Sequence, residues 1–494
     1  MAQALMFQGT GSDVGKTVLV AGLCRALKNR GLRVLPFKPQ NMSNNAAVAD
    51  DGGEIGRAQW LQALACGAQP SIHMNPVLLK PQSETGSQVV VHGHVRCAAK
   101  GRDYQRLKAT LLDAVLHSFD TLQTDADIVL VEGAGSPAEI NLRSGDIANM
   151  GFATAANVPV ILVGDIDRGG VIASLVGTHT VLAPGDREMV AGYMINKFRG
   201  DVSLFDTGVD AVNRFTGWPC FGVLPWQPSA ARLPAEDSVA LERIVRSHDG
   251  GVKIAVPVFG RIANFDDLDP LASEPGVELV FVRAGDGWPD DATAFIIPGS
   301  KSTIADLQQC KALGWDKKLR EAHRAGAMIV GICGGYQMLG QTVADPQGIE
   351  GSATQAMGMG LLRVDTVMHA AKTVQNTVAR SVDGRVPLSG YEIHLGETVG
   401  DDCARPVADL GGRMDGATSK DGRVFGTYLH GLFESGAYRR AFLQRLGVES
   451  DGVDHRQHVE AALDELAAAM EETLDVDAML AVAKSYAVGR RGAA

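Results

Sequence analysis

The sequence has 494 residues, of which 45% are hydrophobic, and its formal net charge is −11 at pH 7. This length exceeds what one hydrophobic core usually organises, so we expect two domains or three. The acidic balance disfavours a protein that coats nucleic acid or an anionic membrane.

Neither a membrane-spanning nor a disulfide-rich protein is indicated. No apolar run approaches the about 20 residues that cross a bilayer, and the first residues lack the basic segment of a signal peptide. The seven cysteines are scattered and form no CxxC pair, so neither a disulfide framework nor a zinc site is expected. These features predict a cytoplasmic location.

In the first half of the chain, short apolar runs alternate with helix-like stretches. The runs, rich in β-branched residues, lie at 33–37, 127–135, 158–167 and 189–196, and a helix is predicted over 15–31. This alternation is typical of a parallel sheet with crossover helices. We therefore predict an α/β domain over residues 1–240.

The second half repeats the pattern after a predicted linker. Residues 225–238 are rich in proline and small side chains, and residues 246–251 are polar, which favours a linker. Apolar runs at 253–260, 277–285, 294–300 and 327–340 predict a second parallel sheet, in a domain over 251–445. Helical spacing of apolar residues between about 455 and 486 predicts two packed helices in a tail over 446–494.

The stretch FQGTGSDVGKTVL, residues 7–19, follows a predicted strand and opens a helix. In that context backbone N–H groups and the helix N-terminus hold phosphate oxygens, so a nucleotide site is predicted. Lys16 is expected to reach the terminal phosphates and Thr17 the magnesium ion. An ordinary glycine turn is the alternative. The predicted phosphate-binding residues are Gly9, Thr10, Gly11, Ser12, Asp13, Val14, Gly15, Lys16 and Thr17.

Thr10 stands where the strict phosphate-loop pattern has glycine, and GTGSDVGKT resembles the loop of dethiobiotin synthetase and its relatives. Those enzymes use ATP to activate a carboxylate. The resemblance implies that Lys38 neutralises a phosphate or a substrate carboxylate. It further implies that Thr17, Glu54 and Glu132 hold Mg²⁺ and that Asn196 recognises the adenine ring.

Each of these assignments has a plainer alternative. Glu132 closes an apolar strand, at the sheet edge where ligands bind in α/β proteins, and its oxygens suit magnesium; a turn carboxylate is the alternative. Lys38 is otherwise a solvated lysine, Glu54 a charge at a helix N-terminus, and Asn196 a strand cap.

The segment AMIVGICGGYQMLG places Cys333 directly after an apolar strand and before a predicted helix, among three glycines. A strand–turn–helix elbow of this kind exposes a nucleophile, and a helix N-terminus favours the thiolate. A buried structural cysteine is the alternative. None of the other six cysteines has comparable surroundings.

A histidine that follows Cys333 by nearly 100 residues, His430 in FGTYLHGLFE, is the expected base. The order cysteine then histidine resembles the class I glutamine amidotransferase domains. That resemblance implies a Cys333–His430 pair with an oxyanion hole at Gly299 and Gly334, the former in PGSKSTIADL.

The sequence does not identify the residue that orients His430 in the Cys333–His430 pair. The common amidotransferase pattern has glutamate two residues after the histidine, whereas residue 432 is leucine here; Glu434 is a candidate that we leave undecided. His394 is a less favoured base because its strand motif GYEIHLG reads as structural.

Taken along its whole length, the chain resembles the cobyric acid synthases, which are glutamine-hydrolysing ligases of cobalamin biosynthesis. The motifs that carry the resemblance include GTGSDVGKT, FKPQNMSNN, DGGEIGRAQ, EGAGSPAEINL, DIDRGG, NKFRGD, GICGGYQMLG and YLHGLF. The resemblance implies ATP, Mg²⁺, glutamine and a corrinoid carboxylate as ligands. It implies amidation of the b, d, e and g carboxylates of adenosylcobyrinic acid a,c-diamide, with ammonia released through a Cys333 thioester and the carboxylate activated as an acyl phosphate.

An anionic corrinoid needs local cations, and the candidates lie around the first-half motifs: Lys38, Arg57, Lys80, Arg143, Arg168, Lys197 and Arg199.

Two alternative functions remain open. Cobyrinic acid a,c-diamide synthases share the architecture but tend to carry a K-x-G-P-D-type motif where this chain has KPQNMSNN. A scaffold ATPase with a vestigial cysteine domain is disfavoured by the intact glycines, Cys333 and His430.

Overall fold

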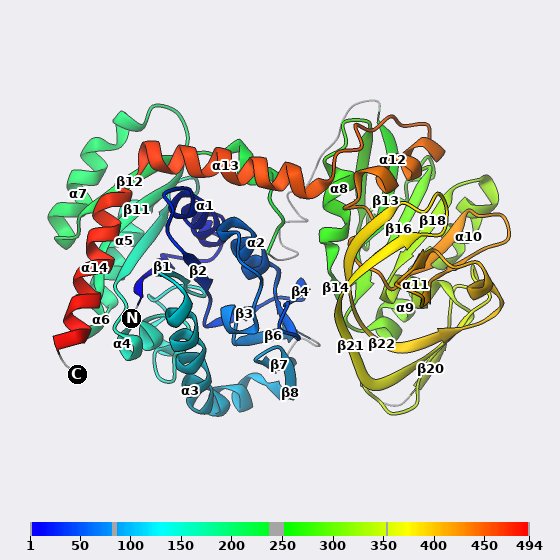
Figure 1. Ribbon diagram of the computed structural model, residues 1–494, viewed down its shortest axis with the longest axis horizontal. Helices are drawn as coiled ribbons and strands as arrows, with labels where there is room; N and C mark the ends of the chain where they lie inside the picture. Colours follow the sequence, from blue (N-terminus) through cyan, green and yellow to red (C-terminus); the bar gives the residue numbers. More distant parts are fainter. Residues whose placement is uncertain (1, 82–85, 237–250, 352–353, 493–494) are drawn as a thin grey trace. The chain divides into compact units, whose positions relative to one another are not determined.

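The computed structural model describes residues 2–81, 86–236, 251–351 and 354–492, and these residues form two compact units (Figure 1). Unit 1 comprises Met1–Ser43, Ala49–Leu233 and Val459–Ala494, and unit 2 comprises Asn44–Val48 and Pro234–His458. The predicted domain end at residue 240 lies outside the described residues, as do residues 237–238 and 246–250 of the predicted linker. The units divide between Leu233 and Pro234, within the described part of that linker. The units therefore exchange segments that a division into consecutive domains does not anticipate.

Unit 1 is built on a six-stranded parallel sheet in the order β12-β11-β10-β1-β9-β2. Its strands are β1 Gln3–Gly9, β2 Val34–Phe37, β9 Ile128–Glu132, β10 Val160–Asp165, β11 Val190–Phe198 and β12 Cys220–Pro225. The four apolar runs of the first half coincide with β2, β9, β10 and β11. The predicted α/β class is confirmed.

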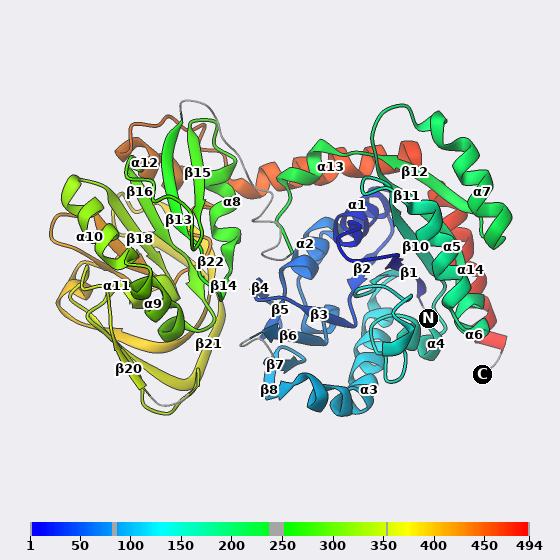
Figure 2. The same ribbon diagram turned by 180° about the vertical axis from the view of Figure 1, so that it is seen from behind.

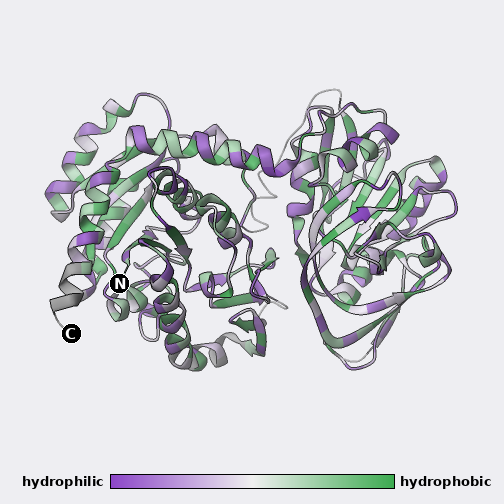
Figure 3. Cartoon of the chain, viewed as in Figure 1, coloured by the Kyte–Doolittle hydropathy of each residue, from purple (hydrophilic) through white to green (hydrophobic). Residues whose placement is uncertain are grey.

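Both faces of this sheet are buried, which explains its continuous apolar runs. Successive side chains of a strand point to opposite faces, so Ala4 and Met6 of β1 enter one hydrophobic core while Leu5 and Phe7 enter the other. Figure 3 shows these strands mostly in the hydrophobic colour. The sheet is thus a rigid central layer whose strand ends can carry a site.

Helices from separate parts of the chain cover the two faces. The first core takes residues of α3 Gly101–Asp125, α4 Met150–Ala156, α5 Val171–Val181 and α7 Asp206–Thr216, and the second those of α1 Lys16–Asn29 and α2 Arg57–Cys66. Unit 1 also contains α6 Pro184–Glu188 and β5 Glu54–Gly56, and a small sheet of β3 Gln40–Met42, β6 Val77–Pro81, β7 Gly86–Val91 and β8 His94–Lys100.

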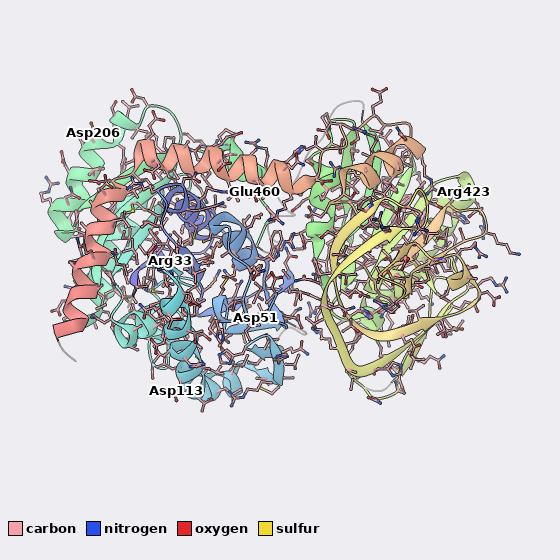
Figure 4. All side chains as sticks on the ribbon, viewed as in Figure 1. Arg33, Asp51, Asp113, Asp206, Arg423 and Glu460 are labelled. Carbon is pink, nitrogen blue, oxygen red and sulfur yellow. The ribbon has the colours of Figure 1, made fainter. Side chains whose placement is uncertain are left out.

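The two predicted C-terminal helices are present as α13 His455–Thr473 and α14 Val476–Gly492. Leu463, Leu466 and Met470 of α13 and Met479 of α14 belong to the second core of unit 1, with β1 and α1. Arg25 of α1 also pairs with Glu460, which Figure 4 labels on α13. The tail therefore completes the core of a unit that begins more than 450 residues earlier in the chain.

Unit 2 contains a second sheet in the order β15-β13-β16-β18-β26-β25, parallel except for the last pair. Its strands are β13 Val252–Pro257, β15 Val277–Val282, β16 Ala294–Ile297, β18 Met328–Ile332, β25 Ala417–Thr418 and β26 Val424–Thr427. Alternation again divides the core, because Ile254 and Val256 face one side and Ala255 the other. The second predicted parallel sheet is present.

The helices of unit 2 cover both faces of this sheet, as the view from behind helps to follow (Figure 2). One face packs against α8 Asp269–Ala272 and α12 Gly436–Arg445, and the other against α9 Thr303–Ala312, α10 Trp315–Ala325 and α11 Gly334–Leu339. Among the residues that the structure describes, no helix is long and apolar enough to cross a membrane.

A further sheet of unit 2 includes the strand motif GYEIHLG at 390–396 but was not otherwise predicted. It runs β20-β19-β21-β23-β24, with β22 also paired to β21, and its longest members are β21 Asp365–Ser381 and β22 Pro387–Val399. The others are β19 Thr342–Asp345, β20 Thr354–Met357, β23 Ala408–Asp409 and β24 Met414–Asp415; β14 Ile262–Ala263 pairs separately with β17 Gly299–Ser300. Much of β21 alternates between exposed and buried residues, so it lacks the continuous apolar run that marks the buried strands.

Candidate active sites

The strand register of unit 1 collects the predicted nucleotide-site residues at one sheet edge. Phe7 of β1 is level with Glu132 of β9, and Asp165 of β10 is level with Asn196 of β11. Because parallel strands end at the same edge, the phosphate loop, Lys38, Glu132 and Asn196 all leave the sheet there. In unit 1 the predicted site therefore follows from topology. Outside the loop, Lys197, directly after Asn196, also has a positive φ of 64°.

The loop between β1 and α1 is held by hydrogen bonds to the neighbouring strand β10. The Thr10 N–H and hydroxyl both donate to the Val163 carbonyl, at 3.0 and 3.3 Å, so threonine at the position of the missing glycine ties the loop to β10. Asp13 and Gly15 have positive φ values of 57° and 91°. The Lys16 ammonium lies against the carbonyls of Gly11 and Gly135, at 3.4 and 3.3 Å.

Glu132 is the centre of a buried polar cluster. Its Oε1 accepts hydrogen bonds from the Thr17 hydroxyl and the Lys38 ammonium, each at 2.8 Å, and its Oε2 accepts one from the Gln62 amide at 2.6 Å. Glu132 is fully buried and Lys38 is 4% exposed. The structure thus brings together Thr17, Lys38 and Glu132, as predicted, and adds Gln62.

These groups fit a magnesium ion. A hydroxyl and a carboxylate in contact at a phosphate loop are the oxygen donors that Mg²⁺ uses together with substrate phosphates. Glu54, the third predicted ligand, pairs with Lys80 at 2.5 Å, and both side chains are buried. Within the described ranges no cluster of three or more His, Cys, Asp or Glu side chains is arranged to hold a metal.

Asn196 supports the phosphate loop. Its amide donates to the Val14 carbonyl at 2.8 Å, and its Oδ1 accepts from the Lys197 N–H at 2.8 Å. A Cβ on Gly15 would lie 2.5 Å from the Asn196 amide nitrogen, which explains why glycine is needed there. Recognition of adenine by Asn196 stays a prediction.

Most of the cations proposed for the corrinoid pocket have a carboxylate partner. Besides Lys38 and Lys80, the ion pairs are Arg143–Asp186 at 2.7 Å, Arg168–Asp13 at 3.2 Å, Lys197–Asp165 at 2.7 Å and Arg199–Asp167 at 2.6 Å. Arg57 is buried and stacks over the Trp60 ring, with its guanidinium carbon 4.1 Å from the ring centre. An anionic substrate would therefore compete with internal carboxylates for these charges.

Cys333 occupies the turn between β18 and α11 in unit 2, with φ 52° and ψ −109°. A non-glycine residue in this region is uncommon, and a strained strand-to-helix turn is how a nucleophile is presented at a sheet edge. The thiol is 8% exposed and lies 3.5 Å from the Ile393 carbonyl oxygen. A Cβ on Gly335 would lie 2.0 Å from the Ile297 carbonyl, so the elbow depends on glycine.

His430 lies beside Cys333, just beyond the end of β26, which pairs with β18. Its Nδ1 is 2.7 Å from Asp267 Oδ2, and Asp267 Oδ1 accepts from the Gly431 N–H at 2.7 Å. Burial alone lowers the pKa of His430, but the charge and hydrogen bond of Asp267, with a further hydrogen bond to Cys333, raise that pKa well above its usual value. Asp267 is therefore the carboxylate that contacts His430 Nδ1.

The predicted oxyanion groups lie in the same place. A Cβ added to Gly299 would be 3.5 Å from the His430 ring, and one added to Gly334 would be 2.8 Å from the Ser300 backbone nitrogen. Gly334 is the first residue of α11, where N–H groups lack intrahelical partners. His394 stacks on Tyr428 with ring centres 3.9 Å apart and lies 3.5 Å from Glu392, which agrees with a structural role.

Two residues of these clusters had no sequence signal. Asp267 lies 163 positions before His430 in an acidic stretch, ANFDDLDP. This stretch has three aspartates, and the sequence does not indicate which of them contacts the histidine. Gln62 lies in the middle of a helix whose other residues are mainly apolar. Only the folded chain shows which polar side chain reaches the histidine or the glutamate.

The fold and the two clusters define a two-part enzyme in which a P-loop nucleotide-binding domain precedes a class I glutamine amidotransferase domain. Comparison with protein families agrees. Residues 5–240 match the CobQ/CobB/MinD/ParA nucleotide binding domain, and residues 253–438 match the CobB/CobQ-like glutamine amidotransferase domain.

The chain belongs to the cobyric acid synthase family, a family of glutamine-hydrolysing ligases of cobalamin biosynthesis. It is 66% identical over 475 residues to a cobyric acid synthase of Sinorhizobium fredii, covering 96% of this chain and 98% of that one. It is 62% identical over 491 residues to a cobyric acid synthase of Mesorhizobium japonicum, covering 98% and 100%. The resemblance seen in the motifs is confirmed.

Proposed function

We propose that the enzyme converts adenosylcobyrinic acid a,c-diamide to adenosylcobyric acid by amidating its b, d, e and g carboxylates, each step using one glutamine and one ATP. The observation that carries this proposal is that one chain of this family holds a Cys333–His430–Asp267 group and a separate Thr17–Lys38–Glu132 group. The first suits release of ammonia from an amide, and the second suits activation of an acid.

At the first site, the Cys333 sulfur attacks the carboxamide carbon of glutamine. His430 holds the thiol proton and passes it to the leaving nitrogen, so that ammonia departs and a thioester remains; water then hydrolyses the thioester to glutamate. Asp267 keeps the imidazole oriented and favours its protonated form. We infer that the backbone N–H groups at Gly299 and Gly334 stabilise the oxyanion.

At the second site, the phosphate-loop N–H groups and Lys16 bind the ATP phosphates and stabilise charge as the terminal phosphoryl group moves to the substrate carboxylate. Lys38, held 2.8 Å from Glu132, is proposed to neutralise a phosphate or the carboxylate. Ammonia attacks the acyl phosphate, and phosphate leaves. Mg²⁺, when bound by Thr17, Glu132 and, as we propose, Glu54, supplies positive charge to the phosphates.

The test is mass spectrometry of the corrinoid after incubation with glutamine, ATP and Mg²⁺. Each amidation replaces a hydroxyl by an amino group, so the expected result is a ladder of four equal mass decreases from the a,c-diamide. Cobyrinic acid itself is offered in parallel. Two decreases from that acid, and none from the a,c-diamide, would instead identify an a,c-diamide synthase.

A further inference from the structure

A five-residue segment of the first half of the chain is built into the amidotransferase unit. Asn44–Val48 belongs to unit 2, although the residues before and after it belong to unit 1. Asn45, Ala46, Ala47 and Val48 are all at most 2% exposed, and β4, Ala46–Val48, packs against the hairpin of β21 and β22. We refer to Asn44–Val48 as the inserted segment.

Two side-chain amides tie the inserted segment to unit 2. Asn45 donates to the Ala235 carbonyl at 3.0 Å, and Asn264 donates to the Ala46 carbonyl at 2.8 Å. Asn264 is 4% exposed and has a positive φ of 51°, a conformation that asparagine tolerates better than most residues. It stands immediately before the short helical turn Phe265–Leu268, which carries Asp267.

The same Asn264 amide reaches the catalytic histidine through one tyrosine. It donates to the Tyr391 hydroxyl at 2.8 Å, and the Tyr391 ring stacks on the His430 imidazole with centres 5.0 Å apart and planes 12° from parallel. The two backbones also exchange hydrogen bonds, at 2.9 and 3.2 Å. A Cβ on Gly390 would lie 2.0 Å from the His430 carbonyl, so glycine permits this close pairing.

His430 is thus fixed from two directions, by Asp267 at its ring edge and by Tyr391 on its face. We propose that Asn264 and Tyr391 are positioning residues for His430 and that the inserted segment holds them in place. This inference rests on the proposed glutaminase role of Cys333 and His430. It assigns to residues of the ATP-dependent half a part in the geometry of glutamine hydrolysis.

The test uses the full-length chain and measures glutamate release from glutamine, with ammonia-dependent amidation as the control. Tyr391→Phe keeps the ring stack but loses the hydroxyl, and Asn264→Ala loses the amide. Each is expected to lower kcat for glutamate release about 10-fold, because small displacements of a catalytic group are costly, while KM for glutamine changes less than about 2-fold and ammonia-dependent amidation is kept. The double variant is expected to be no worse than either single one.

A matched control is Val378→Ser on β21, where the side chain is 81% exposed; it should leave all rates unchanged. Unchanged kcat in Tyr391→Phe and Asn264→Ala, additive losses in the double variant, or equal losses with ammonia would each overturn the positioning role. The proposed function fails separately, if Cys333→Ala retains glutamine-dependent activity.

Discussion

The two candidate active sites lie at equivalent edges of two parallel sheets, but their charges are arranged differently. In unit 1 the charged groups neutralise one another, as in the pairs of Lys38 with Glu132 and Lys80 with Glu54. In unit 2 the Asp267 carboxylate contacts the His430 imidazole, which in turn lies beside the Cys333 sulfur. The first site must release its internal pairs to take up phosphates and acids, whereas the second is arranged before its substrate arrives.

The sharpest way to separate the two sites is Cys333→Ala. Loss of the nucleophile should lower glutamate release and glutamine-dependent amidation by about 10³-fold or more. Amidation with high ammonia should survive, because the phosphate site is untouched. Rates are measured with both nitrogen donors, and loss of both activities would show that the sites are not independent. Cys310→Ala, at another buried cysteine, is the control.

Asp267→Asn tests the contact between Asp267 and His430 in unit 2. We expect kcat for glutamine hydrolysis to fall about 10²- to 10⁴-fold, because the imidazole loses the group that orients it and favours its charged form. Glu434→Gln, at the residue that the sequence suggested, should have little effect. An equal loss in the two variants would contradict the assignment of Asp267.

The same variant changes the dependence of stability on pH. The pKa of folded His430 is raised above its unfolded value, so its contribution to stability is complete below about pH 6.5 and is lost as pH rises through the folded pKa. Urea unfolding of the native chain should therefore show a fall in stability above pH 6.5. Asp267→Asn should flatten that fall, and an unchanged slope would argue against the ion pair.

Lys16→Ala tests the site of unit 1. It removes a contact that strengthens as charge develops on the phosphates, and we expect amidation to fall about 10²- to 10³-fold with either nitrogen donor. Lys28→Ala, in the last turn of the same helix, is the matched control. A Lys16 variant that amidates at the normal rate would refute the phosphate-loop assignment.

The metal ligands are distinguished by comparing Glu132→Gln with Glu54→Gln. Glu132→Gln should raise the Mg²⁺ concentration for half-maximal amidation about 10-fold or more, and Glu54→Gln should raise it less. Each substitution should also lower the free energy of unfolding by about 3 kcal/mol, because each removes the carboxylate that pairs with a buried lysine. If only the unfolding free energy changes, Glu54 is not a ligand.

The smallest effect is expected at Asp306, whose carboxylate accepts a hydrogen bond from Ser300 at 2.6 Å next to the proposed oxyanion group. Burial raises the pKa of Asp306 to about 6, so the folded state loses stability as pH rises from about 4 to 6. Asp306→Asn should raise the unfolding free energy by about 1 kcal/mol at pH 7.5 and by nothing below pH 4. Denaturant titrations at the two pH values measure this.

Sequence reasoning succeeded where one local pattern carries the information. The strands β2, β9, β10 and β11 were found because buried parallel strands are continuously apolar, and the phosphate loop and Cys333 because each lies between a strand and a helix at a fixed spacing. Of the hairpin of β21 and β22, only the strand motif GYEIHLG within β22 was found, because an exposed, alternating strand carries a weak signal.

The sequence could not predict which residues far apart in the chain contact one another. Asp267 and His430 are 163 residues apart, and an aspartate in a polar loop has many possible partners. The helical spacing of residues 455–486 predicted burial of one face but not what it would meet, since an amphipathic stripe does not identify its partner. Likewise, nothing in NNAAV marks it as belonging to the second unit.

The packing of α13 and α14 on β1 and α1 bears on how this protein is made. On the ribosome, the nucleotide-binding unit is translated first, yet its second core lacks Leu463, Leu466 and Met470 until all of the amidotransferase unit has emerged. Although α1 and α2 cover part of this core, the rest stays exposed in the nascent chain while residues 234–458 are made. Exposed apolar surface of this kind favours chaperone binding or aggregation. If the gene were split near codon 240, the N-terminal fragment would lack α13 and α14 and could not complete its second hydrophobic core alone.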